Sequence, residues 1–333
     1  MRGALSRRTA ALVLLLALVV LTGIGVLIYA HRKVPAVPGR PTTAGAVFSQ
    51  DLLATTLPNS TASVPVLRLP PLAMLAGDAQ YLVAQLGGRS NIVRTPMMGT
   101  RIICLGKGGG GGSVWTVQNH LGQAYGVNIE RLRWLWRAPN STSYTCTMYG
   151  VATTVVQPDV ARLDIDQRTT ILTATPVARS SAQWFMSSDS CVGAVPDPGV
   201  PECAVARHSS TVLQHTVDTG GATSASVLTD VQLSREYGSY PGGTSTVDVT
   251  AQATVLGTDG QPCAPTRSTT ARLVITNDLH HLKANVTVTG VPVNQTASCG
   301  RSLSVSAVVN HVSGNPVTIE GPSYSNAMVM FNR

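Results

Sequence analysis

Residues 245–256 read STVDVTAQATVL, a stretch in which polar and apolar side chains alternate. A period of two turns one face of a β-strand toward a core and the other toward solvent, and valine and threonine favour strands. Short Val- and Thr-rich stretches recur at 145–156, 162–175, 210–217, 224–233, 271–277, 282–289, 302–309 and 316–319, and 327–331 would add an edge strand. Turn sequences such as Gly257-Thr258-Asp259-Gly260 separate them without intervening helices. The sequence therefore predicts a mainly β fold, an antiparallel β-sandwich-like ectodomain.

One stretch has helical spacing. Apolar residues recur there at Leu72, Leu75, Ala79, Leu82 and Leu86, after Pro70-Pro71 and before Gly87-Gly88. Proline suits the start of a helix and glycine its end. We therefore expect an amphipathic helix over 72–86, so that the β fold carries one or two short helices.

An uncharged apolar run, AALVLLLALVVLTGIGVLIYA, occupies residues 10–30. Roughly 20 apolar residues span the ~30 Å core of a bilayer as a helix, whereas cleaved signal peptides have a shorter apolar region. The run predicts an uncleaved transmembrane signal anchor. A cleaved signal peptide and a buried core helix remain alternatives.

The flanking charges orient this segment weakly, because Arg2, Arg7 and Arg8 before it are nearly matched by Arg32, Lys33 and Arg40 after it. Ser6-Arg7-Arg8 also resembles the start of a twin-arginine export signal. Since no second strong apolar span follows, we expect the N-terminus inside and the C-terminal part outside the cytoplasm, at the cell surface, in a secretory lumen or on a virion envelope.

The expected organisation follows from these segments. Residues 1–9 form a short cytoplasmic tail and residues 10–30 the anchor. Residues 31–65, rich in Pro, Thr and Ser, form a stalk. Residues 66–143 form a mixed helix and loop region packed on the ectodomain, and residues 144–333 form the β-rich ectodomain itself.

Six cysteines follow the apolar run, and none lies in a CxxC pair or at zinc-site spacing. In an exported chain, disulfides are the default. If neighbours along the chain pair, the bonds are Cys104 with Cys146, Cys191 with Cys203, and Cys263 with Cys299. Free thiols in a reducing compartment are the alternative.

Asn-x-Ser/Thr sequons begin at Asn59, Asn140, Asn285 and Asn294. Each is a glycosylation site if the chain enters a eukaryotic secretory pathway. In a chain this rich in serine and threonine, two or three such triplets arise by chance. A bacterial exported envelope protein, in which the sequons are accidental, therefore also fits.

The formal net charge of +8 raises the question of a nucleic-acid partner. The basic residues beyond the apolar run are dispersed and form no long Lys or Arg run, so no nucleic-acid partner is predicted.

Residues 129–137, IERLRWLWR, carry the most unusual local chemistry. Tryptophan and arginine dominate binding hot spots, so a protein or glycan surface is one interpretation. It comprises Arg131, Arg133, Trp134, Trp136 and Arg137. The alternative places the indoles in the core under the arginine stems.

An anchor, a stalk and a luminal domain are also the layout of Golgi glycosyltransferases, and Asp164-Ile165-Asp166 resembles their DxD element. That resemblance implies binding of a metal and of sugar-nucleotide phosphates by Asp164 and Asp166, the first suspects for catalysis. Those enzymes need a nucleotide-binding α/β sheet, and this region offers no βαβ alternation.

Other enzyme motifs fail. In Leu105-Gly106-Lys107-Gly108 a glycine replaces the Ser or Thr of a P-loop, so the glycine run 108–112 predicts a flexible loop, and neither GxSxG nor HExxH occurs. We predict no cofactor and no metal.

The sequence favours an anchored, extracytoplasmic β-rich module for binding or assembly, resembling a viral envelope or cell-surface glycoprotein. A tethered enzyme acting on glycans or envelope polymers is the second hypothesis.

Overall fold

The computed structural model describes residues 46–49, 51–92, 97–119, 126–154, 159–177, 182–186, 203–205, 209–235, 243–277, 279–320 and 325–332, with side chains omitted for 119, 182–186 and 203–205. The chain divides into two compact units, Met1–Pro41 and Thr42–Arg333, and every described residue lies in the second. The apolar run at 10–30 and the tail at 1–9 lie outside the described residues. Within the described ranges, no helix has the length and apolarity needed to cross a bilayer.

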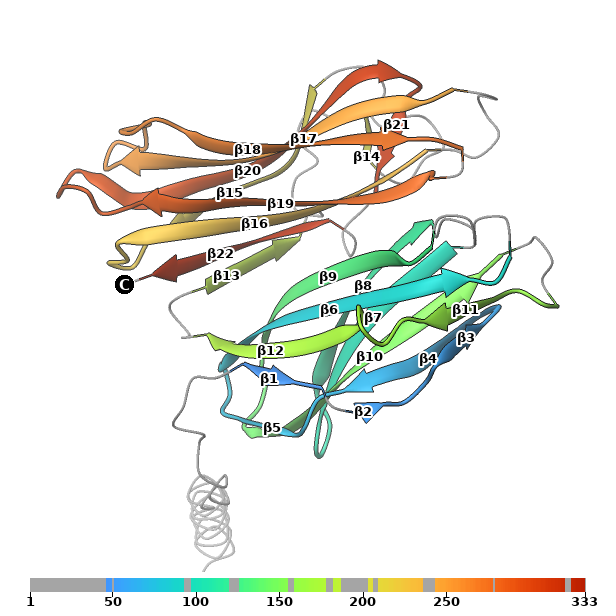
Figure 1. Cartoon of the computed structure of the whole chain (residues 1–333). Coiled ribbons are helices and arrows are strands. Elements are labelled where there is room, and N and C mark those ends of the chain that lie inside the picture. Colours follow the sequence, from blue (N-terminus) through green and yellow to red (C-terminus); the bar gives the residue numbers. More distant parts are fainter. Residues whose placement is uncertain are drawn as a thin grey trace, which may run out of the picture. The chain divides into compact units, whose positions relative to one another are not determined.

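The first half of the unit is an antiparallel β-sandwich (Figure 1). One sheet has the order β1-β12-β6-β11-β3, with β9 also paired to β6, and the other has the order β5-β10-β7-β8; β2 and β4 form a separate pair. The strands are β1 (Val47–Phe48), β2 (Asp51–Leu52), β3 (Thr56–Pro58), β4 (Ser60–Arg68), β5 (Leu72–Met74), β6 (Ala79–Ser90), β7 (Met97–Gly106), β8 (Gly111–Asn119), β9 (Asn128–Arg137), β10 (Thr142–Thr153), β11 (Arg162–Ile165) and β12 (Ile171–Val177).

The second half is another antiparallel sandwich. Its sheets have the orders β13-β22-β16-β21-β14, with β19 also paired to β16, and β15-β20-β17-β18. The strands are β13 (Ala182–Met186), β14 (Cys203–Val205), β15 (Ser209–Asp218), β16 (Ser224–Ser234), β17 (Ser245–Gly257), β18 (Arg267–Ile275), β19 (His281–Pro292), β20 (Cys299–Gly314), β21 (Val317–Ile319) and β22 (Asn326–Asn332). The predicted mainly β, antiparallel sandwich class is confirmed.

The second sandwich repeats the topology of the first. Every pairing among β5 to β12 recurs between the strands ten positions later, and the outer partners of β11 and β12, which are β3 and β1, correspond to β14 and β13. For example, β6 pairs with β9, β11 and β12, and β16 pairs with β19, β21 and β22. The chain thus contains one strand plan twice, and the two copies divide between β12 and β13 rather than near residue 143.

Alternating side chains fill a separate core in each sandwich. Along β17 every second residue from Ser245 to Val255 is buried, and the intervening residues are partly exposed. This is the pattern that the opening stretch of the sequence predicts. In the first sandwich the core contains larger side chains, among them Leu82, Met148 and Trp136.

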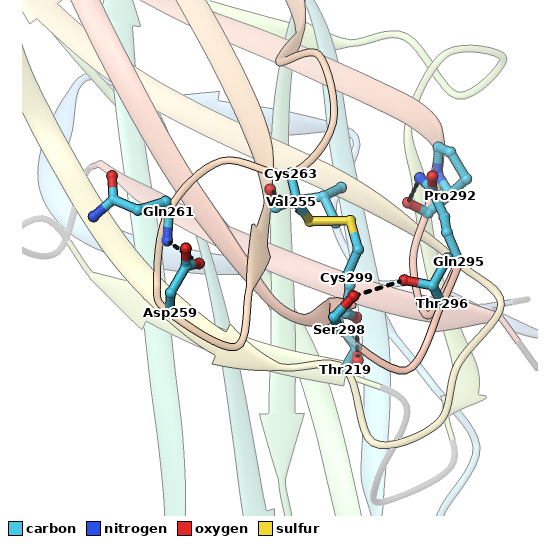
Figure 2. Close-up of a disulfide and its surroundings, with 11 residues drawn as sticks. Thr219, Val255, Asp259, Gln261, Cys263, Pro292, Gln295, Thr296, Ser298 and Cys299 are labelled. Carbon is cyan, nitrogen blue, oxygen red and sulfur yellow. Dashed lines mark hydrogen bonds between the residues drawn. A yellow bond between two sulfur atoms is a disulfide. The ribbon is translucent and has the colours of Figure 1, made fainter.

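Two disulfides staple the described structure, one in each sandwich. Cys104 and Cys146 lie directly opposite each other on β7 and β10, with 4.0 Å between their Cα atoms. Cys263, in the loop after β17, is bonded to Cys299 at the start of β20 (Figure 2). Both are pairs of neighbouring cysteines. The third neighbour pair, Cys191 with Cys203, lies outside the residues whose side chains are described.

The predicted helix over 72–86 is wrong, because this stretch forms β5, a turn and most of β6. Leu82, Ala84 and Leu86 are fully buried at a spacing of two, which is the strand period, whereas the spacing of four between Leu82 and Leu86 alone fits a helix as well. Gly87 and Gly88 do not end a helix either. They continue β6 where Thr169 and Leu163 approach so closely that a Cβ atom would clash.

Two further expectations change. The C-terminal part of the stalk predicted at 31–65 belongs to the first sandwich. It contains β1 to β3 and the start of β4, and Leu57 is fully buried in the core. The region 66–143, expected to mix helix and loop, contributes strands from β4 to β10. The strand at 327–331 exists as β22, but it pairs with β13 on one side and β16 on the other, so it is not an edge strand.

Candidate binding face

The exposed face of the sheet β5-β10-β7-β8 carries a row of three large side chains. Arg101 on β7 lies directly opposite Tyr149 on β10 and directly opposite Trp115 on β8. Residues opposite each other in antiparallel strands project from the same face. Trp115 is 41% exposed, Arg101 is exposed and Tyr149 is partly exposed. An indole, a guanidinium group and a phenol thus lie side by side on an open surface.

The chemistry of this face is apolar with a single positive charge. Among the described strands β7, β8 and β10, Arg101 is the only charged residue. Its Nη2 donates a hydrogen bond to Ser113 Oγ over 3.1 Å, which ties the guanidinium group to β8, the strand that also carries Trp115. Leu105, 60% exposed, extends the apolar surface along β7. The face therefore offers flat apolar rings around one cation.

The glycine run builds the hairpin that brings Trp115 next to Arg101. Gly108, Gly109 and Gly110 have positive φ angles, which glycine adopts without a steric penalty, and Gly106 N donates to Gly110 O over 2.9 Å. Gly111 begins β8 where a Cβ atom would lie 2.2 Å from Cys104 O. The run forms a defined turn and the start of a strand, not the flexible loop expected.

The surface predicted at 129–137 does not form. Trp134 and Trp136 are buried in the core of the first sandwich, and Arg133 is buried on the other face of β9. Arg131 and Arg137 are exposed at separate places on β9. The sequence pattern did not reveal that β9 is covered on both faces over this stretch, so the alternative with the indoles in the core holds.

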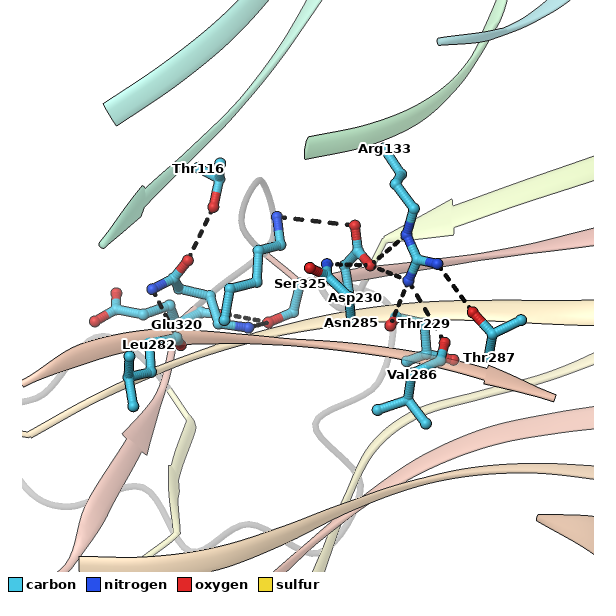
Figure 3. Close-up of polar contacts among 12 residues, drawn as sticks. Thr116, Arg133, Thr229, Asp230, Leu282, Asn285, Val286, Thr287, Glu320 and Ser325 are labelled. Carbon is cyan, nitrogen blue, oxygen red and sulfur yellow. Dashed lines mark hydrogen bonds and ion pairs between the residues drawn. The ribbon is translucent and has the colours of Figure 1, made fainter. Parts of the chain in front are cut away.

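A buried polar cluster connects the two sandwiches through Arg133 (Figure 3). Its Nε donates to Asp230 Oδ1 over 2.8 Å and its Nη2 donates to Thr229 O over 2.9 Å, both on β16. Its Nη1 donates to Thr287 Oγ1 on β19 over 3.0 Å. Asn285 Nδ2 donates to the same Asp230 Oδ1 over 2.8 Å. One arginine of the first sandwich thus binds two neighbouring strands of the second.

Two more ionisable groups are buried close by, Lys283 beside Asp230 and Glu130 on the opposite face of β9 from Arg133, and burial shifts both pKa values. Burial raises the pKa of Glu130 to about 8, against the hydrogen bond from Thr100 Oγ1 at 2.5 Å. Burial lowers the pKa of Lys283, whose Nζ lies 4.0 Å from Asp230 Oδ2. Glu130 therefore carries its proton at pH 7, and the ammonium form of Lys283 is less favoured than in water.

The suspected catalytic pair, Asp164 and Asp166, serves local structure. Asp164 Oδ1 accepts a hydrogen bond from Arg162 Nε over 2.9 Å. Asp166 Oδ1 accepts hydrogen bonds from the backbone N–H groups of Arg168 and Thr169, closing the turn between β11 and β12. Among the described residues, no three His, Cys, Asp or Glu side chains gather into a group that could hold a metal ion.

The four sequon asparagines differ in how their side-chain amides are used. Asn59 Nδ2 donates to Thr154 O, and its Oδ1 accepts from Thr154 N. Asn285 Nδ2 donates to Asp230, and Asn294 Nδ2 donates to Ala222 O over 2.6 Å. Asn140 is exposed beside the β7–β8 hairpin. A glycan is attached through Nδ2. Asn140 is therefore the best placed of the four to carry one.

Comparisons with known proteins assign no family. No protein-family model and no curated protein matches the chain. Among solved structures, it is similar to the CBM22-1-CBM22-2 tandem domain of Paenibacillus barcinonensis Xyn10C, with 10% identity over 88% of this chain and 99% of that chain, at a TM-score of 0.29. It is also similar to the T13 particle of infectious bursal disease virus, with 11% identity over 87% of this chain and 69% of that chain, at a TM-score of 0.29. Broad bean stain virus gives 9% identity over 91% of this chain and 93% of that chain, at a TM-score of 0.20. We draw no functional conclusion from similarities at this level.

Proposed function

We propose that this chain is a single-pass membrane protein that presents its two β-sandwiches outside the cytoplasm as a glycan-binding module. The row of Trp115, Arg101 and Tyr149 is its binding face, and the ligand is an acidic glycan. In this proposal residues 10–30 anchor the chain with the N-terminus inside, and N-glycans decorate the ectodomain where the host supplies them.

The single observation that carries the proposal is the chemistry of that row. Flat aromatic rings on an open sheet offer apolar faces against which the C–H faces of sugar rings can pack. Arginine binds carboxylate and sulfate groups through parallel N–H donors, and Arg101 meets no acidic residue on the neighbouring strands. The combination favours sugars that carry negative charge over neutral sugars.

The proposed location has separate support. Disulfides form and persist in oxidising compartments, and both described sandwiches contain one. The apolar run has the length of a membrane span. Extraction of membranes at alkaline pH and protease protection of intact vesicles test this part; release of the full-length chain by alkali, or an ectodomain accessible only from the cytoplasmic side, would refute it.

Binding is tested by titrating the full-length chain in detergent with heparin and hyaluronan hexasaccharides, using maltohexaose as the neutral comparison, and following heat and tryptophan fluorescence. We expect saturable binding of an acidic oligosaccharide. Trp115→Ala and Arg101→Ala should each weaken it about tenfold or more, equivalent to about 1.4 kcal/mol. Phe48→Ala, which removes another exposed ring on β1, should leave affinity unchanged.

Two results would contradict the binding proposal. One is equal affinity of Trp115→Ala and the unaltered chain for the acidic oligosaccharides. The other is maltohexaose binding as tightly as the charged hexasaccharides, since Arg101 would then have no electrostatic role.

A further inference from the structure

Four buried polar atoms at the contact between the sandwiches have no hydrogen-bond partner in the described structure. They are Lys283 Nζ, Asp230 Oδ2, Thr229 Oγ1 and Glu130 Oε1. Leaving buried polar atoms without partners is costly, and each such atom in a native protein calls for an explanation. The binding face on β7, β8 and β10 does not use these residues, so their arrangement needs a separate account.

Lys283 and Asp230 are placed to meet. Asp230 on β16 lies opposite Asn285 on β19, and Lys283 is two residues before Asn285 on the same face of that strand. Diagonal neighbours of this kind lie about 7–8 Å apart at Cα, within reach of a lysine side chain. Lys283 Nζ and Asp230 Oδ2 are 4.0 Å apart, and both side chains are almost wholly excluded from solvent.

The two oxygen atoms of Asp230 have different surroundings. Oδ1 accepts hydrogen bonds from Arg133 Nε and from Asn285 Nδ2, each over 2.8 Å. Oδ2 faces the lysine amine without a hydrogen bond. Donors fixed on one oxygen stabilise the negative charge that develops there when a nucleophile attacks the carboxyl carbon. Oδ1 thus has the setting of a carbonyl oxygen and Oδ2 that of a leaving group.

The surroundings of Lys283 favour its nucleophilic form. Burial lowers the pKa of Lys283, which increases the fraction of uncharged, nucleophilic amine. Glu130, fully buried on β9 of the other sandwich, interacts electrostatically with Lys283, and its pKa of about 8 leaves it uncharged at neutral pH. It therefore does not hold the lysine in its ammonium form.

We propose that Lys283 and Asp230 form an intramolecular amide bond, an isopeptide between β19 and β16. Within the ion pair a proton passes from Nζ to Oδ2, the freed amine attacks Cγ, the Nζ–Cγ bond forms and the Cγ–Oδ2 bond breaks. Oδ2 leaves as water with two of the three protons of the ammonium group, so the step is a condensation that needs no oxidant or reductant.

The mass of the chain tests this proposal independently of glycan binding. The full-length chain, made in a bacterial host without N-glycans, reduced and denatured, should weigh about 18 Da less than its sequence, the mass of one water. Trypsin should give a branched peptide that joins residues 208–235 to 273–301, with no cleavage after Lys283. A full sequence mass together with normal cleavage after Lys283 would overturn the proposal.

Single-residue variants test which side chains form the amide bond. Lys283→Arg keeps a positive charge but removes the amine, so it should restore the full mass, while Lys107→Arg in the exposed hairpin should keep the deficit. Glu130→Gln keeps a neutral group beside Thr100 and should leave the deficit unchanged. A deficit that persists in Lys283→Arg, or that maps to other residues, would exclude this bond.

Discussion

Removal of the Cys104–Cys146 disulfide should cost more stability than removal of Cys263–Cys299, although the two loops are similar. A cross-link stabilises largely by restricting the unfolded chain, by an amount that depends on loop length. The sequence separations are 42 and 36 residues. These give about 4.0 and about 3.8 kcal/mol at 25 °C, a negligible difference.

The two disulfides differ in how deeply they are buried in the folded state. Cys104 and Cys146 are fully buried in the core of the first sandwich, whereas of the second pair Cys299 is buried and Cys263 lies exposed in a loop. Replacing a buried cysteine by alanine also empties the volume of its sulfur atom, at about 1 kcal/mol. We therefore expect a loss of about 6 kcal/mol for the first double variant and about 5 kcal/mol for the second.

Urea unfolding at pH 7, followed by tryptophan fluorescence and by circular dichroism, measures both losses. A natural domain has about 5–15 kcal/mol of stability, so the Cys104→Ala, Cys146→Ala variant should unfold at much lower urea, or be unfolded from the start. Equal losses for the two variants, or a larger loss for the Cys263–Cys299 pair, would show that core packing around the first bond adds nothing.

Further predictions concern single residues. Glu130 binds a proton more tightly in the folded chain, so its contribution to stability is complete below pH about 4.5 and is lost as the pH rises toward about 8; Glu130→Gln should flatten this fall in urea titrations between pH 5 and 8. Arg133→Met should lower the free energy of unfolding by about 3 kcal/mol, because the buried Asp230 Oδ1 loses its main hydrogen-bond donors, whereas the exposed Arg131→Met should change it by less than about 0.5 kcal/mol in the same assay. In eukaryotic cells Asn140→Gln should remove a glycosidase-sensitive gel shift that Asn59→Gln leaves in place, and the reverse result would mean that exposure of the amide does not govern occupancy.

Local alternation predicted much of the fold because each strand buries one face in its own sandwich. The Val- and Thr-rich stretches from 245–256 outward became strands such as β17 and β20 for this reason. The failure at 72–86 has a physical cause. Leucines at 82 and 86 fit both a helix and a strand, and the choice was made by pairing with β9 and β12, which no local pattern contains.

The candidate site was harder to predict than the fold. Trp134 and Trp136 attracted attention because they alternate with arginines, yet β9 is buried on both faces and the rings are core residues. Trp115 stands alone in the sequence after the glycine run. Its partners Arg101 and Tyr149 become neighbours only through strand register. The same holds for Asp230 and Lys283, which are far apart along the chain.

The repeated strand plan has a consequence for biosynthesis. Strands β5 to β12 and β15 to β22 offer the same succession of pairing positions, so a strand of one half fits, in outline, a vacant position in the other. Tandem domains are prone to such misassembly, and synthesis from the N-terminus lets the first half complete its own pairing early. Each described disulfide joins cysteines within one half. A bond that joined Cys104 or Cys146 to a cysteine of the second half would therefore mark a chain in which strands had been exchanged.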